Sequence, residues 1–155
     1  MKKWLRYGAL VLAVLVFGAE PSAGKDVGKL QPVQVVCMSR AGTEVILWTD
    51  TGDRGAGPTP ADALKAMKSA AAGEIFLDTA EYLLLTADCL DILAEMGAQL
   101  RPSCSLCLME GNPDMEKIAQ FLSLHTPAIT LMEYRAGLRQ LQTLKTIEGR
   151  MSLVS

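Results

Sequence analysis

Glu74-Ile-Phe-Leu-Asp-Thr-Ala-Glu-Tyr-Leu-Leu-Leu-Thr86 is the stretch of sequence that decides the fold of this chain. It lies between two segments with helical patterns, and it has too many bulky apolar side chains to be a linker. A short apolar run bounded by turn residues is typical of a strand buried on both faces. Asp78-Thr79 is a potential break within it. A buried strand between helices predicts a sheet that is packed by helices.

The residues that precede this stretch predict a hairpin followed by a loop. Val33–Met38 and Glu44–Trp48 are short apolar runs rich in β-branched residues, and the turn between them contains Gly42. This pattern predicts two antiparallel strands. Thr49–Thr59 is rich in glycine and aspartate, and its composition predicts a loop.

A helix is predicted to begin directly after that loop. Thr59 is a suitable N-cap, Pro60 suits the first helical position, and Asp62 favours the first turn. Gly73 is expected to end the helix as a left-handed residue. Apolar residues at helical spacing predict one buried face, formed by Ala63, Leu64, Met67 and Ala71.

The rest of the chain predicts further helices and one more strand. Asn112 is expected to cap a helix that begins at Pro113, and Thr86 to cap the one before it. The fold class is therefore α/β, a mixed sheet with an N-terminal hairpin, packed by three to four helices. The expected elements are a helix at Ala87–Gly97, a strand at Ser103–Glu110, a helix ending near Leu124, a helix at Ile129–Lys145 interrupted by Gly137, and a frayed strand or tail at Thr146–Ser155.

Length, composition and charge limit the function classes. The chain has 155 residues, which suits one ordinary domain, and 50% of them are apolar. Its net charge of −2 argues against nucleic acid as a partner.

The first 23 residues have the composition of a targeting segment. Lys2, Lys3 and Arg6 form a basic start, and the uncharged run Tyr7–Ala19 follows them. This run is shorter than the roughly 20 residues that span a bilayer. Residues 1–23 are therefore interpreted as a signal peptide, or as an uncleaved anchor that keeps the chain at the membrane. Residues 24–155 are expected to form a single α/β domain, exported to the outer face of the cytoplasmic membrane or the extracytoplasmic space.

The four cysteines require a structural and a chemical interpretation. Cys104 and Cys107 form a C-x-x-C pair, which occurs in thiol-redox proteins and in zinc sites. The pair lies in a strand pattern, however, where a spacing of three places the side chains on opposite faces. Buried free thiols are therefore favoured, and a metal or thiol site at Cys104 and Cys107 is the alternative. One long-range disulfide stays open, for example from Cys37 to Cys104 or Cys107, and the disulfide state of Cys89 is open too.

Other reactive residues have ordinary structural explanations. His125 is the sole histidine and follows a helix, where an imidazole interacts with the helix C-terminus. Asp50 and Asp53 are fragments of a calcium-loop pattern that lacks the bidentate Glu. Asp78 and Glu81 suit either a charged pair in a groove or exposed strand ends. The sequence thus predicts no catalytic residues, no enzyme and no cofactor.

The order of elements over Val33–Leu124 resembles the N-terminal domain of the Ger(x)C family, the C-subunit lipoproteins of spore germination receptors. Arg101 and Gly111 occupy matching places. The chain has Ala19-Glu20 in place of the family's lipobox cysteine, so a thioether lipid cannot form there, and Asp78-Thr79 replaces a Gly-His. The similar segments are Asp62-Ala-Leu-Lys-Ala-Met67, Glu74–Thr86, Leu90-Asp-Ile-Leu-Ala-Glu-Met96 and Leu100–Gly111.

This resemblance implies a non-enzymatic, membrane-associated role in assembly. The expected function is protein–protein interaction or scaffolding in spore germination or sporulation at the cell envelope. The expected partners are membrane-associated proteins, among them germination receptor subunits. Two alternatives remain from the residues themselves: an exported thiol or metal-binding protein that uses the C-x-x-C pair, and a small-ligand-binding domain.

Overall fold

The computed structural model of the chain describes residues 30–155. The predicted leader, residues 1–23, lies outside the described residues. Within residues 30–155, no helix has the length and the apolar composition needed to cross a membrane.

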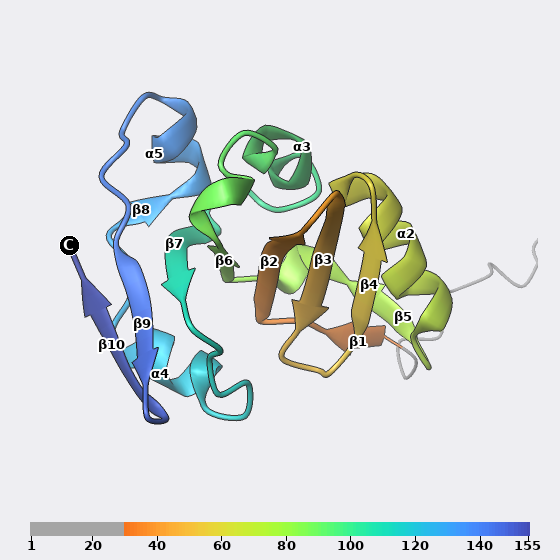
Figure 1. The fold of residues 1–155 in the computed structure, drawn as a ribbon, viewed down its shortest axis with the longest axis horizontal. Helices are drawn as coiled ribbons and strands as arrows, with labels where there is room; N and C mark the ends of the chain where they lie inside the picture. Colours follow the sequence, from red (N-terminus) through yellow and green to blue (C-terminus); the bar gives the residue numbers. More distant parts are fainter. Residues whose placement is uncertain (1–29) are drawn as a thin grey trace, which may run out of the picture.

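The main element of the fold is an eight-stranded mixed sheet (Figure 1). Its strand order is β10-β9-β7-β6-β2-β3-β4, and β8 pairs with β7 as well. Neighbours among β2, β6, β7 and β9 are parallel, and the other pairs are antiparallel. This confirms the predicted α/β class with its N-terminal hairpin. The strands are β2 (Val35–Ala41), β3 (Glu44–Thr49), β4 (Arg54–Gly57), β6 (Tyr82–Leu85), β7 (Ser105–Glu110), β8 (Ile129–Thr130), β9 (Thr143–Ile147) and β10 (Arg150–Val154).

Four helices within the described residues divide between the two faces of the sheet. On the first face, α2 (Pro60–Ala70), α3 (Leu93–Gly97) and α5 (Leu131–Arg135) contribute side chains to the larger apolar cluster. On the second face, α4 (Ile118–Leu124) packs against a smaller cluster that includes Leu84 and Leu144. The second face therefore has much less helical cover than the first.

Only the second half of the stretch that decides the fold is a buried strand at the centre of the main sheet, and the stretch does break at Asp78-Thr79. Its end is β6, in which every residue is buried. Its beginning is β5 (Glu74–Phe76), which pairs in parallel with β1 (Leu30–Pro32) in a separate two-stranded sheet. A 3₁₀ turn joins the two halves, and the Thr79 hydroxyl accepts a hydrogen bond from the Val33 N–H at 3.1 Å.

The predicted start of α2 is confirmed, because the Thr59 hydroxyl accepts a hydrogen bond from the Asp62 N–H at 3.2 Å. Two neighbouring predictions are wrong. The helix ends at Ala70 with an extended cap at Ala71, so Gly73 is not its left-handed terminator. The expected loop Thr49–Thr59 contains β4.

The glycines of β4 explain why its sequence indicates a loop although the segment is a strand. Gly55 and Gly57 face α2 so closely that an added Cβ would lie 2.2 Å from the Ala63 carbonyl oxygen and 2.7 Å from the Ala63 nitrogen, respectively. Only glycine permits backbone contact at this distance. The glycines therefore bring α2 against the edge of the sheet.

The C-terminal third differs most from the prediction. Ile129–Lys145 is not one helix, because α5 ends at Arg135 and the segment continues into β9. The tail beyond it is paired as β10, through a turn in which Glu148 and Gly149 have positive φ. Among the described strands, the backbone of this hairpin pairs with the rest of the sheet at Leu108–Glu110 of β7, and Leu144 is buried in the second-face cluster.

Two shorter corrections concern helix starts. The expected helix at Ala87–Gly97 is a 3₁₀ turn, Ala87–Cys89, followed by α3, and Thr86 makes no capping hydrogen bond. Its hydroxyl donates to Asp88 instead. The next helix, α4, begins after Lys117 rather than at Pro113, so Asn112 is not its N-cap.

Candidate binding surface

The second face of the sheet is open over its β3–β4 end. The partly buried residues Ile46 and Trp48 lie in β3, and Arg54 and Ala56 of β4 are exposed. Since side chains alternate along a strand, these four residues point away from α2, which lies against Gly55 and Gly57 on the other face. The helix of the second face, α4, packs near Leu84 instead.

A groove lies over this open end of the sheet. Its volume is about 360 Å³, within the range of small-molecule pockets. One part of its lining comes from β2, β3 and β4, and the other comes from the connection between β7 and α4. The lining includes Ser39, Trp48, Arg54, Asn112, Pro113 and Met115.

Several polar groups of the groove have no partner within residues 30–155. Among the described residues, the side chains of Ser39, Trp48, Arg54 and Asn112 form no hydrogen bond or ion pair. Ser39 and Trp48 are half-buried, and Arg54 and Asn112 are exposed. The groove therefore combines one indole ring, one guanidinium and two further polar groups that are available to a ligand.

The acidic residues close to the groove in sequence are already engaged. The Asp50 carboxylate accepts hydrogen bonds from the backbone N–H groups of Gln34 and Val35, both at 3.2 Å. Asp53 accepts one from the Thr51 hydroxyl at 2.7 Å. The carboxylate of Asp114 lies 3.2 Å from the Lys117 ammonium. Asp50 and Asp53 thus stabilise a turn, and residues 30–155 contain no group of three or more metal-binding side chains.

The structure places the C-x-x-C cysteines apart. Cys104 belongs to the apolar cluster of the first face, and Cys107 to that of the second. All four cysteines are buried and free, so the open question of a disulfide from Cys37 is answered: none forms. Burial raises the pKa of Cys104 and of Cys107 to about 12. Burial also raises the pKa of Cys37 and Cys89, so the buried thiols favour the unreactive protonated form.

The remaining predicted residues lie at separate places. The His125 ring stacks on Phe121 with ring centroids 4.4 Å apart, and its Nδ1 lies 3.1 Å from the Phe121 carbonyl oxygen, as expected at a helix end. Glu81 is exposed and lies 3.7 Å from the Arg101 guanidinium. Asp78 is exposed in the 3₁₀ turn. These residues form no common site.

The β10 end of the sheet is a second candidate surface. Among the described residues, β10 pairs only with β9, so its outer edge carries free backbone hydrogen-bonding groups. Natural edge strands are usually protected by lysine, proline or a covering element. In β10 the only charged residue is Arg150, at its start. By contrast, the edge strand at the other end, β4, is only four residues long.

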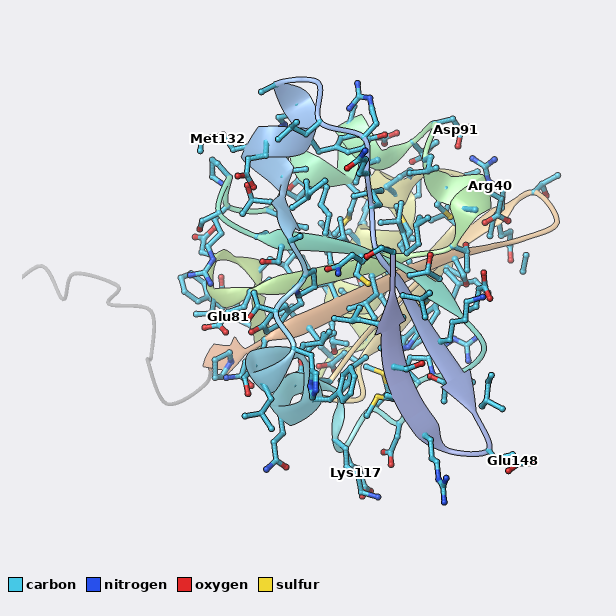
Figure 2. The ribbon with its side chains drawn as sticks, turned by 90° about the vertical axis from the view of Figure 1, so that its left-hand side faces the viewer. Arg40, Glu81, Asp91, Lys117, Met132 and Glu148 are labelled. Carbon is cyan, nitrogen blue, oxygen red and sulfur yellow. The ribbon has the colours of Figure 1, made fainter. Side chains whose placement is uncertain are left out.

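Exposed apolar side chains accompany this edge. Ile147 is 67% exposed and Val154 is 43% exposed. Both face away from buried Leu144, since they alternate with it across the hairpin register. Figure 2 shows the turn of the hairpin, marked by Glu148, at the lower right of the view and Met132 at the upper left. The turn of the hairpin is therefore well separated from the exposed Met132 of α5.

Sequence reasoning missed both surfaces. The groove is built from segments that are far apart in the chain, and Arg54 lay in a segment interpreted as a loop. One available indication was Trp48, the only tryptophan after the leader. For the hairpin, the indication was Glu148-Gly149 between two runs with β-branched residues.

Comparisons of the chain with protein-family models, with curated proteins and with solved structures found no match.

Proposed function

We propose that this chain is a non-enzymatic interaction domain that is exported and acts at the cell envelope. It takes a strand of a partner protein onto the outer edge of β10. The partner is a membrane-associated protein of a germination or sporulation assembly, in line with the resemblance to the Ger(x)C family. The open β10 edge is the observation that carries the proposal.

Strand addition suits this edge for two physical reasons. A partner strand would satisfy the free N–H and C=O groups of β10, which gives affinity that depends little on sequence. The exposed side chain of Val154 lies on β10 itself and would contact a side chain of that strand, which gives specificity.

Site-specific crosslinking in sporulating cells of the source organism tests the proposal. A photoreactive amino acid replaces exposed Ser152 of β10, and the matched control replaces exposed Ser69 of α2. Position 152 is expected to crosslink to one membrane-associated protein, and position 69 is not. Equal crosslinking from both positions, or none from position 152, would refute the interaction at β10.

A pair of surface variants distinguishes binding at the β10 edge from non-specific association of exposed apolar residues. Val154→Lys is expected to abolish the crosslink from position 152, because it places a charge on β10 next to the proposed partner strand. Met132→Lys also replaces an exposed apolar residue, 61% exposed, but on α5, and is expected to leave the crosslink unchanged. Loss of the crosslink in both variants would argue against the β10 edge.

A further inference from the structure

We propose that the groove beside Trp48 binds a small organic anion, in which a carboxylate is attached to a flat apolar group. The groove lies on β2, β3 and β4, whereas the β10 edge lies at the other end of the strand order. This second binding activity therefore goes beyond the interaction proposed above and does not depend on it.

The charge of the ligand follows from Arg54. Its guanidinium is exposed, forms no ion pair among the described residues, and lines the groove. Asp53, its neighbour in the chain, accepts a hydrogen bond from Thr51, and Asp114 beyond Pro113 is paired with Lys117. A planar guanidinium matches the geometry of a carboxylate and can donate two parallel hydrogen bonds to it.

The flat apolar part of the ligand follows from the other lining residues. Trp48 offers an indole ring, on which flat groups stack favourably. Pro113 and Met115 supply apolar atoms from the connection that precedes α4, and a methionine sulfur adapts well to aromatic rings. Ser39 and Asn112 supply polar groups for a second substituent.

The size of the groove limits the ligand further. A volume of about 360 Å³ is at the lower end of the range for small-molecule pockets. It suits a single ring with one acidic group rather than a nucleotide or a long chain.

Trp48 allows a direct binding experiment. The chain contains two tryptophans, Trp4 and Trp48, so the full chain with Trp4→Phe has one indole N–H resonance, from Trp48. Benzoate is the probe, and benzamide is its neutral isostere. Benzoate is expected to shift this resonance with a Kd of about 1 mM, as suits a ligand of this size in an open groove. Benzamide is expected to bind about tenfold more weakly, because it lacks the charge.

Variants at Arg54 test the assignment of the charge. Arg54→Gln is expected to weaken benzoate binding about tenfold, and Arg54→Lys to retain part of the affinity. Because the Arg54 side chain is exposed and forms no hydrogen bond or ion pair with the described residues, both variants should keep the fold, which circular dichroism checks. Arg150→Gln is the matched control, since Arg150 is an exposed arginine on β10. It is expected to leave benzoate binding unchanged.

Three results would overturn the proposal. These are the absence of a shift at benzoate concentrations tenfold above the expected Kd, equal affinity for benzamide and benzoate, and undiminished benzoate binding in folded Arg54→Gln. None of these results bears on crosslinking at β10, so the two proposals can fail independently.

Discussion

Gly55→Ala is expected to lower the free energy of unfolding by about 2 kcal/mol, because β4 and α2 are in backbone contact. The new Cβ would lie 2.2 Å from the Ala63 carbonyl oxygen and 2.4 Å from the Met67 nitrogen, whereas ordinary contact begins near 3.4 Å. The helix would have to retreat by 3.4 − 2.2 = 1.2 Å. Overpacking of this kind costs up to about 3 kcal/mol, and the reduced entropy of the unfolded chain returns somewhat less than 1 kcal/mol.

Urea unfolding followed by far-UV circular dichroism measures this effect. With a slope of about 1.5 kcal/mol per molar urea, the midpoint should fall by roughly 1.3 M. Ala56→Val is the matched control, because Ala56 lies between the two glycines but is exposed, and a change within about 0.5 kcal/mol is expected there. A Gly55→Ala variant as stable as the parent chain would refute the close packing of β4 on α2.

Three further predictions concern other parts of the fold. Burial holds the pKa of Cys104 and Cys107 at about 12, against an ordinary value near 9. Stability should therefore be fully present below pH 9 and fall from pH 9 to 12, by up to about 1.4 kcal/mol per pH unit for each thiol, in urea titrations. Thr59→Ala removes the N-cap hydrogen bond of α2 and should lower the Tm by about 4 °C in a thermal melt. Asp50→Ala leaves the N–H groups of Gln34 and Val35 without their acceptor, and should cost about 1.5 kcal/mol in urea unfolding.

Each of these predictions has a clear contrary result. Stability that stays constant from pH 9 to 11 would contradict the buried thiols. Thr59→Ser retains a hydroxyl and should recover most of the Tm, so equal loss in Thr59→Ser and Thr59→Ala would contradict the capping role. An Asp50→Ala variant as stable as Asp50→Asn, which keeps one acceptor oxygen, would contradict the anchoring of β2.

The sequence predicts those elements whose local pattern agrees with their tertiary environment. β6 is buried on both faces and reads as an unbroken apolar run. At the start of α2, Thr59, Pro60 and Asp62 all favour the same structure, and the helix begins there. In the C-x-x-C pair, the strand pattern correctly predicts side chains on opposite faces.

The errors arise where a distant contact determines the conformation. Gly55 and Gly57 indicate a loop locally, but they form a strand because α2 lies against them. The leucines between Ile129 and Lys145 have helical spacing by coincidence, and Gly137, with φ +108°, lies in the loop that follows α5. The groove could not be predicted for the same reason. Arg54 and Asn112 are far apart in the chain, and the strand order alone brings them to the lining of one groove.

The limited attachment of the C-terminal hairpin has a dynamic consequence. Its two strands pair with each other along five residues, whereas their backbone pairing with the remaining described strands is limited to Leu108–Glu110 of β7. Leu144, Met151 and Leu153 also pack on the second-face cluster. The free energy of a local opening rises with the number of hydrogen bonds and buried apolar contacts that it has to break. A local opening of the hairpin is expected to release β9 and β10 together while β2, β6 and the first-face cluster stay closed, and it would have to expose the buried Leu144.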